Sequence, residues 1–477
     1  MHSIDGDYFS LAFTLYTLHL TPSTSKIALN CDFSCTLQKK AVPLCHFRKK
    51  PIRAKILNTM LFSRQKYLDR MIAHKHNHQI KVITGIRRCG KSYLLFNLFY
   101  NHLLQSGVDA SHIICIDLEN RRNKTLRNPD VLLEYIDSQM IDQQMYYILL
   151  DEVQLVDEFE DVLNSYLKVP NADVYVTGSN SKFLSKDVIT EFRGRGDEIR
   201  VYPLSLREIC EAQPELDWKN AWELYLHYGG LPLCVLQQSE EEKIEYLKSL
   251  FSETYLKDIK ERNQVKNDME MEHLLDIISS SIGSLTNPQK LSNTFDTAGK
   301  MKLSAVTIKQ YLDYFEDAFL IHRSKRYDIK GKKYISTPYK CYFTDMGLRN
   351  ARLNFRQIEE THIMENIIYN ELCVRGYNVD VGIVEIREPN EQGNSIRKQI
   401  EVDFVVNRGS QRYYIQSAYA LPSEEKVKQE ERPLRAIPDS FKKIIVVKED
   451  ILPRRNEDGI LMLGLRQFLL DEHSVEL

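Results

Sequence analysis

The stretch IKVITGIRRCGKS, residues 80–92, decides the fold of this chain. It joins a short run rich in β-branched residues to the pattern G-x-x-x-x-G-K-S, and the apolar spacing after it predicts a helix over 92–104. A glycine loop between a strand and a helix is the setting that a phosphate-binding P-loop requires. Its glycines let backbone N–H groups surround an anion, and the helix N-terminus adds positive potential.

The polar residues of this loop have expected roles. Lys91 would neutralise the β- and γ-phosphates of ATP, and the Ser92 hydroxyl would bind Mg²⁺. A glycine-rich connection that binds nothing is the alternative, and the complete motif in this context weakens it. The sequence therefore predicts ATP and Mg²⁺ as cofactors, with nucleotide contacts from Gly85, Cys89, Gly90, Lys91, Ser92 and Tyr93.

The apolar run YYILLDE, residues 146–152, ends in two acids. Asp151 is expected to hold Mg²⁺, directly or through water, and Glu152 to polarise the attacking water. A strand that ends in a solvated acidic turn would look the same in isolation, but here the same α/β unit already has a P-loop. We therefore assign the chemistry of hydrolysis to Lys91, Asp151 and Glu152.

Two further segments supply candidates whose roles stay open. Ser179 and Asn180 follow the next predicted strand and could contact the γ-phosphate or the water, or one of them could only cap the following helix. Arg193 and Arg195 lie just before the last strand. One of them could act as an arginine finger on a neighbouring subunit, and a solvated arginine is an equal alternative.

Alternating strands and helices define the fold class. Five β-rich runs separated by helical stretches indicate an α/β fold with a parallel sheet covered on both faces. The predicted strands are Ile80–Thr84, His112–Asp117, Tyr146–Asp151, Asp173–Thr177 and Glu198–Val201. Four segments are expected to follow one another: an ATPase domain at 60–205, a helical lid segment at 206–260, a winged-helix-like segment at 261–346 and a second α/β domain at 355–455. Because composition changes at Met60, residues 1–59 are expected to lie outside the fold, unless they form a basic arm that touches nucleic acid or lipid.

Composition excludes several classes of protein. The 477 residues include 64 Lys+Arg and 66 Asp+Glu, a net charge of −2, so this is no histone-like chain coated in basic residues. No apolar run approaches the ~18 residues of a membrane span. The nine cysteines are odd in number and lack a C-x-x-C pair, which argues against a zinc ribbon or a disulfide framework. Reduced thiols in a cytoplasmic protein are the simplest interpretation.

Nine motifs give the chain a family resemblance. They are GIRRCGKS (85–92), YYILLDEVQ (146–154), VYVTGSNS (174–181), FRGR (192–195), VYPLS (201–205), YGGLP (228–232), TIKQYLDYFEDAFLIHRSKRYDIKGKK (307–333), YFTDMGLRN (342–350) and ENIIYNELCVRGY (365–377). Together they resemble prokaryotic AAA-type ATPases of the AAA+ superfamily whose C-terminal half is a domain of unknown function. The resemblance covers about residues 60–450. It implies an AAA+-like ATPase module, a winged-helix segment and a restriction-endonuclease-like C-terminal domain.

The winged-helix segment offers a surface for duplex DNA. Its second helix is predicted at Thr307–Phe319, where acidic residues disfavour contact with a phosphate groove. The turn after that helix is basic and could clamp a DNA backbone without reading sequence. Its basic residues are Arg323, Lys325, Arg326, Lys330, Lys332 and Lys333. A protein-docking surface is an equal alternative.

The endonuclease-like domain is expected to fold without cutting DNA. Glu365 and Asp403 could supply two acids for a metal. Gln416, however, stands where such a nuclease has a carboxylate, and Ala418 stands where it has a lysine. A lysine from elsewhere, such as Lys398, is the main alternative source of a cation.

The leading hypothesis is a cytoplasmic Mg²⁺-dependent ATPase that couples ATP hydrolysis to a rearrangement of its C-terminal domains. In one form of this hypothesis, the rearrangement takes place on bound DNA. One alternative is a nucleotide-dependent protein-interaction or signalling switch with slow hydrolysis, and another is an ATP-driven nuclease. A protein partner and a homo-oligomer are compatible with each of them, and no membrane contact is expected.

Overall fold

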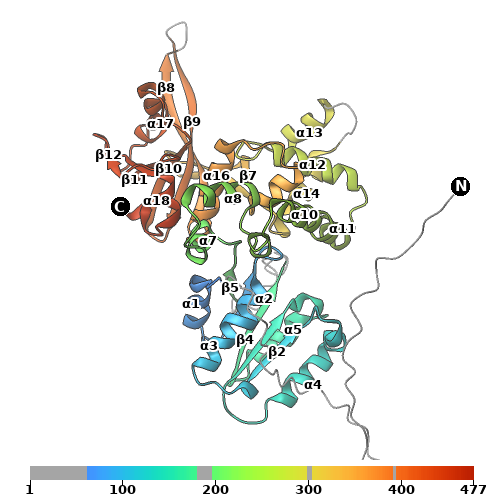
Figure 1. Cartoon of the computed structure of the whole chain (residues 1–477). Coiled ribbons are helices and arrows are strands. Elements are labelled where there is room, and N and C mark those ends of the chain that lie inside the picture. The colour runs from blue at the N-terminus through green and yellow to red at the C-terminus, as the bar shows by residue number, and fades with distance from the viewer. Residues whose placement is uncertain (1–61, 180–195, 298–302, 390–393) are drawn as a thin grey trace, which may run out of the picture. The chain divides into compact units, whose positions relative to one another are not determined.

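A computed structural model describes residues 62–179, 196–297, 303–389 and 394–477. Two sheets organise this part of the chain, one with five strands and one with eight (Figure 1). All the described residues belong to one compact unit. The predictions for residues 1–59, Asn180, Arg193 and Arg195 lie outside the described residues and stay predictions.

The first sheet is fully parallel, with the strand order β2-β3-β4-β1-β5, and it confirms the predicted fold class. Every residue of β1 and β3 is buried, as expected for strands that are covered on both faces. The strands are β1 (Ile80–Thr84), β2 (Ile113–Asp117), β3 (Tyr146–Asp151), β4 (Ala172–Gly178) and β5 (Gly196–Arg200).

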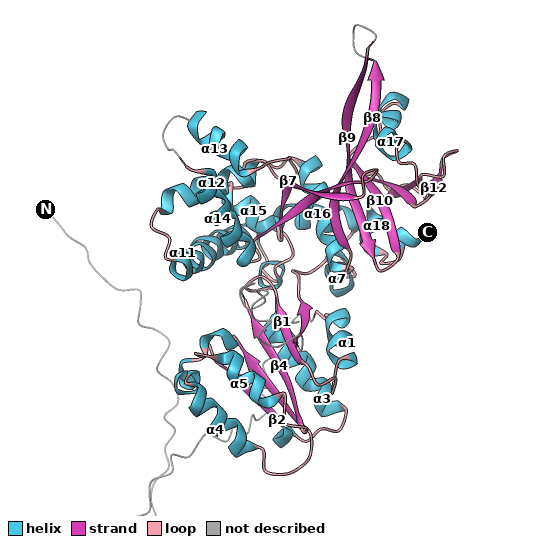
Figure 2. Cartoon of the chain, turned by 180° about the vertical axis from the view of Figure 1, so that it is seen from behind, coloured by secondary structure: helices cyan, strands magenta, loops and turns pink. Residues whose placement is uncertain are grey.

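Helices cover both faces of this sheet (Figure 2). Ile83 and Leu149 pack with the helices of one face, and their neighbours Val82 and Ile148 pack with those of the other, as the alternation of a strand requires. The first face carries α1 (Gln65–Ala73) and the helix made of α2 (Lys91–Tyr93), the π-turn η1 (Leu94–Phe99) and α3 (Tyr100–Gln105). The second face carries α4 (Pro129–Gln139) and α5 (Phe159–Tyr166).

Helices dominate the middle of the chain, as predicted for the lid segment and the region after it. The segment predicted to be a lid contains α7 (Leu206–Ala212), α8 (Trp218–Tyr228), α9 (Pro232–Val235), α10 (Glu240–Ser249), the π-helix η6 (Leu250–Leu256) and α11 (Lys257–Asn263). The next helices are α12 (Asp268–Ser280), α13 (Pro288–Thr297) and α14 (Ala305–Asp317). No helix in the described ranges is long and apolar enough to cross a bilayer.

The second sheet is mixed, with the order β12-β13-β11-β10-β9-β8-β6-β7. Its strands are β6 (Ile321–Asp328), β7 (Lys333–Phe343), β8 (Asn378–Pro389), β9 (Ser395–Arg408), β10 (Gln411–Ala418), β11 (Lys442–Val447), β12 (Arg454–Arg455) and β13 (Leu461–Gly464). Its helices are α15 (Met346–Arg352), α16 (Glu360–Val374), α17 (Glu424–Arg435) and α18 (Leu465–Leu470). In Figure 1, β8 and β9 form a long ribbon that extends beyond the neighbouring strands.

The β6–β7 hairpin of the segment at 261–346, which was predicted to be winged-helix-like, belongs to this second sheet. β6 pairs in parallel with β8, where Arg326–Asp328 lie opposite Val381–Ile383. The boundary expected between the segment at 261–346 and the domain at 355–455 therefore does not separate two sheets. The basic turn and the acids of the C-terminal domain are parts of one structure.

Candidate functional site

The P-loop connects β1 to α2 at the carboxyl edge of the five-stranded sheet. Gly85 and Gly90 have φ angles of 142° and 102°. A Cβ on Gly85 would lie 2.0 Å from the Val201 carbonyl oxygen, so the loop can approach β5 this closely only with glycine. Buried Lys91 donates from Nζ to the carbonyl oxygens of Gly85 at 3.0 Å and Ile86 at 3.2 Å. Its ammonium therefore faces the inside of the loop, against neutral partners.

Thr177 connects the two predicted acids to the neighbouring strand. Because β4 lies between β1 and β3, its carboxyl end stands between the P-loop and the acids. The Thr177 hydroxyl donates to Asp151 Oδ1 at 2.5 Å and accepts from the Glu152 N–H at 2.9 Å. Glu152 has a φ of 54°, which is uncommon outside glycine and is typical of functional sites. Thr177 was not singled out from the sequence, although it ends the predicted strand that precedes Ser179.

Asp151 and Ser92 form a pair suited to a magnesium ion. Burial raises the pKa of Asp151, and hydrogen bonds from Thr177 and Ser92 lower it. The Ser92 hydroxyl therefore lies within hydrogen-bonding reach of the Asp151 carboxylate. Mg²⁺ prefers hard oxygen ligands such as a carboxylate and a hydroxyl, so these residues fit the ion.

The Glu152 carboxylate is held by two side chains. Ser179 Oγ donates to Glu152 Oε2 at 3.1 Å, and Gln154 Nε2 donates to the same oxygen. Ser179 is thus brought to the acids, as one of its predicted roles requires. Gln154 was not recognised from the sequence, although it follows Glu152 by only two positions.

A cavity of about 590 Å³ adjoins these groups. This volume falls in the range of small-molecule sites. Its polar side contains Cys89, Gly90, Lys91, Ser92, Tyr93 and Glu152, and its apolar side contains Phe62, Leu204, Pro232, Leu233 and Leu236. The Cys89 thiol is buried and donates to the Val201 carbonyl oxygen at 3.5 Å. The same cavity is thus lined by the predicted nucleotide-binding residues and by the start of α9.

Contacts join the P-loop to the last helices of the segment at 206–260, η6 and α11. The Tyr255 hydroxyl donates to the Arg87 carbonyl oxygen at 2.7 Å. The Arg87 guanidinium lies 3.3 Å from Asp258 in α11. One loop residue is therefore held through both its backbone and its side chain.

The YGGLP and YFTDMGLRN motifs meet at Asp345, the N-cap of α15. The Asp345 carboxylate accepts from the Gly230 N–H at 2.7 Å and from the Leu348 N–H at 3.1 Å. A Cβ on Gly230 would lie 2.1 Å from the Leu204 carbonyl oxygen, so the turn needs glycine. Burial raises the pKa of Asp345 to about 6. Both motifs were visible in the sequence, but their contact was not.

The basic turn is only partly free. Arg323 is bound by two acids of α14, Glu316 and Asp313, the latter at 2.7 Å. The Arg323 charge is therefore neutralised by acids of the protein itself, contrary to its predicted place among the residues that contact DNA. Arg326 donates to Gln399 at 3.0 Å. The exposed cations of the set are Lys325, Lys330, Lys332 and Lys333.

A second buried cluster surrounds Lys340 of β7. Its Nζ lies 2.8 Å from Glu365 Oε1, 2.6 Å from Glu401 Oε1 and 4.0 Å from Asp403 Oδ1. Tyr342 donates to the same Glu365 oxygen at 2.6 Å. Burial and the Glu365 charge raise the pKa of Asp403, and the three carboxylates raise the pKa of Lys340 against the effect of its burial. The sequence singled out Glu365 and Asp403 but missed the lysine between them.

Lys398, the predicted substitute lysine, is not in this cluster. Its side chain is half exposed and lies 3.4 Å from Glu388. Lys398 lies three residues before Glu401 on β9, ahead of the register shift after Val402, and side chains of a strand alternate, so Lys398 points away from the face that carries Glu401. Gln416 does lie beside Asp403, since its Oε1 accepts from the Asp403 N–H at 3.4 Å.

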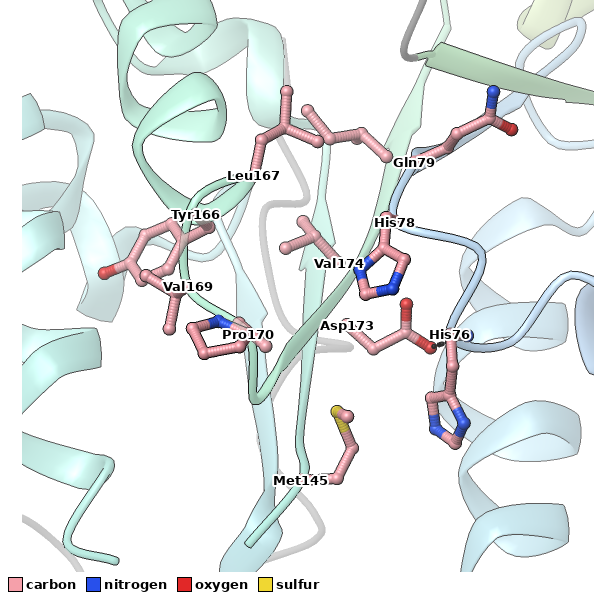
Figure 3. Close-up of a pocket in the computed structure, with 12 residues that line it drawn as sticks. His76, His78, Gln79, Met145, Tyr166, Leu167, Val169, Pro170, Asp173 and Val174 are labelled. Carbon is pink, nitrogen blue, oxygen red and sulfur yellow. Dashed lines mark hydrogen bonds between the residues drawn. The ribbon is translucent and has the colours of Figure 1, made fainter. Parts of the chain in front are cut away.

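A small cavity of about 30 Å³ lies at the other edge of the five-stranded sheet (Figure 3). His76 and His78 border it, together with Asp173 of β4. His76 Nε2 lies 2.8 Å from the Tyr147 hydroxyl, and His74 pairs with Asp197. The described residues contain no group of three or more His, Cys, Asp or Glu that could hold a metal ion. His76 and His74 thus each have a polar partner within the protein.

Two family models match the chain. Residues 77–210 match an AAA domain, and residues 219–359 match a domain of unknown function, DUF8612. The chain is 31% identical to an uncharacterized protein of Haemophilus influenzae over 420 residues, which are 87% of this chain and 100% of that protein. An uncharacterized protein of Methanocaldococcus jannaschii is 28% identical over 420 residues, covering 84% of this chain and 87% of that protein.

Among solved structures, the chain is similar to the Aeropyrum pernix ORC1 protein in complex with DNA, at 12% identity and a TM-score of 0.31. That match covers 62% of this chain and 93% of the other. Cdc6p of Pyrobaculum aerophilum matches at 10% identity and a TM-score of 0.26, over 68% and 97%. These scores are low, and the fold assignment stands on the strand order and the AAA domain match.

Proposed function

This chain belongs to the same protein family as the Haemophilus influenzae protein, and from that premise we propose that it is a Mg²⁺-dependent ATPase of AAA type. The observation that carries the proposal is Thr177, which holds Asp151 and Glu152 together at the sheet edge beside the P-loop. The AAA domain match over 77–210 supports it. A cytoplasmic location is part of the same proposal and rests on the cysteine pattern of the sequence.

The side chains divide the work of hydrolysis. Lys91 exchanges its two carbonyl partners for oxygens of the β- and γ-phosphates, and the loop N–H groups surround the same phosphates. Ser92 and Asp151 hold Mg²⁺, which supplies positive charge to the phosphates when bound. Glu152 accepts a hydrogen bond from the attacking water, and Ser179 and Gln154 keep its carboxylate in position. Arg195 stays a candidate finger for a neighbouring copy.

Nucleotide binding is coupled to the C-terminal part through contacts of the loop and lid. Arg87 lies inside the P-loop and is held by Tyr255 and Asp258, so a change in the loop moves its partners. The lid turn at Gly230 is bound to Asp345, which directly follows the β7 region of the second sheet. These contacts favour a protein whose C-terminal sheet responds to ATP, and they equally support the slow nucleotide switch that binds a protein partner.

Duplex DNA is the proposed partner of the exposed lysines in the β6–β7 turn. Lys330, Lys332 and Lys333 are exposed next to one another, and contacts of this kind bind a phosphate backbone without reading its sequence. The C-terminal sheet is proposed to be restriction-endonuclease-like because its elements run helix, three strands, helix, strand.

The test is the ATPase rate of the full chain with and without duplex DNA, measured beside a plasmid-nicking assay. Glu152→Gln serves as the control for contaminating ATPases, since it keeps the fold and loses the base. If the parent hydrolyses ATP and duplex DNA increases the rate, the result supports an ATPase that acts on DNA. A slow rate that DNA leaves unchanged supports the switch, and nicking supports the nuclease. A rate equal to that of Glu152→Gln in all conditions contradicts the proposal.

A further inference from the structure

Three carboxylates converge on one ammonium inside the eight-stranded sheet. Glu365 comes from α16, and Glu401 and Asp403 come from the same face of β9. Lys340 reaches them from β7 and is within 4.0 Å of all three, with two contacts shorter than 3 Å. Its side chain is 4% exposed. A charge this deeply buried requires partners of opposite sign, and the cluster provides them.

Two of these acids, Glu365 and Asp403, are those that a metal-dependent nuclease of this proposed fold would use. A divalent cation in a protein needs carboxylate oxygens that no other cation holds. Here one Glu365 oxygen accepts from both Lys340 and Tyr342. One Asp403 oxygen accepts from the Ser417 N–H at 2.8 Å. A metal would also stand beside a fixed positive charge, which is unfavourable at short distance in a buried site.

We propose that the Lys340 ammonium is the built-in cation of this cluster, so that the second sheet holds its carboxylates together without a divalent metal. Lys340 takes the place of the ion and is not a catalytic lysine, because its ammonium is held by the Glu365 and Glu401 carboxylates and lies beside Asp403. It follows that the intact chain does not cut DNA at this site. It also follows that loss of Lys340 uncovers a site of oxygen ligands for Mn²⁺ or Mg²⁺.

The first experiment uses the full chain without nucleotide. Free Mn²⁺ is followed by its electron paramagnetic resonance signal during a titration of the parent and of Asp403→Asn. We expect both proteins to bind the same number of Mn²⁺ ions, because the P-loop site is unchanged between them. One Mn²⁺ bound by the parent and lost in Asp403→Asn would overturn the proposal, as would plasmid nicking by the parent that vanishes in Asp403→Ala.

The second experiment removes the charge. Lys340→Met keeps the length of the side chain and should bind one Mn²⁺ more than the parent, and that extra ion should be lost in Lys340→Met/Asp403→Asn. Lys398→Met, on the opposite face of β9, is the matched control and should bind as the parent does. A folded Lys340→Met protein that binds no extra Mn²⁺ contradicts the proposal. If that variant does not fold, the comparison of the parent with Asp403→Asn decides.

Discussion

The carboxyl edge of the first sheet and the interior of the second both place a buried lysine among the residues that the sequence marked as functional. Counted over the whole residue, Lys91 is 4% exposed and Lys340 is 3% exposed, so burial does not distinguish them. Their partners do. Lys91 donates to two neutral carbonyls beside a cavity, whereas Lys340 is held by carboxylates. An ammonium whose partners are neutral can bind an anionic ligand. An ammonium that carboxylates already neutralise contributes to the stability of the fold instead.

The largest effect should come from Lys91→Ala, which removes the mobile cation of the loop. Charge-assisted bonds to phosphate are worth about 1.5–3 kcal/mol each, so ATP affinity should fall by about 100-fold or more. Isothermal titration with ATP measures it, and Lys398→Ala is the control. The melting temperature should change less than for Lys340→Ala, because water from the adjoining cavity can donate to the two freed carbonyl oxygens. An unchanged ATP affinity would show that this loop is not the ATP-binding site.

Glu152→Gln should separate binding from turnover. The amide keeps the size of the side chain but no longer polarises the water, so hydrolysis should slow by about 10²–10⁴-fold while ATP still binds. Single-turnover hydrolysis and ATP titration on the same protein give both values. Turnover equal to that of the parent would assign the base to another residue.

The two regions were not equally predictable from the sequence. In the first, strands and loop follow one another along the chain, so Lys91, Asp151 and Glu152 could be identified from local patterns. Thr177 escaped because its role depends on β4 lying between β1 and β3, which is a property of the sheet order.

In the second region, the essential pair joins residues far apart in the chain. Lys340 and Glu401 are 61 positions apart, and their contact depends on β7 joining the C-terminal sheet. One local signal was present, since Lys340 sits in the run YKCYF, residues 339–343, where every residue is buried. A lysine in an apolar run should have raised the question of its partner.

Lys340→Ala should lower the stability of the protein and leave its ATP affinity unchanged, the opposite of what is expected for Lys91→Ala. Removing one partner of a buried ion pair leaves charge without compensation and costs about 3–5 kcal/mol of unfolding free energy. Urea denaturation of the full chain measures it, with Lys398→Ala expected within about 0.5 kcal/mol of the parent. ATP affinity of the folded variant should stay unchanged. A variant as stable as the parent would show that the cluster does not need its lysine.

Asp345→Asn tests the contact that joins the two regions. The pKa of Asp345 is raised to about 6, above its value in the unfolded chain, so the proton favours the folded state. Stability from this group is present below about pH 4 and is lost as pH rises through 6, by about 3 kcal/mol in all. Asparagine does not titrate. The parent should therefore lose stability relative to Asp345→Asn between pH 4 and pH 7, and parallel stability curves over that range would contradict this.

The smallest effect concerns the basic turn. Lys332→Glu/Lys333→Glu reverses two exposed charges, whereas Arg323→Ala removes a charge that α14 already neutralises. If the turn binds DNA, the double variant should weaken duplex affinity at every sequence and reduce the salt slope by about 2, at roughly 0.9 per lost phosphate contact. Arg323→Ala should leave that slope unchanged.

The control for net charge is Lys257→Glu/Lys266→Glu, which reverses two exposed charges near α11. Fluorescence anisotropy with a labelled duplex compares the two double variants and Arg323→Ala. Equal losses in both double variants would mean that only net charge matters, and the turn would then have no defined role in DNA binding.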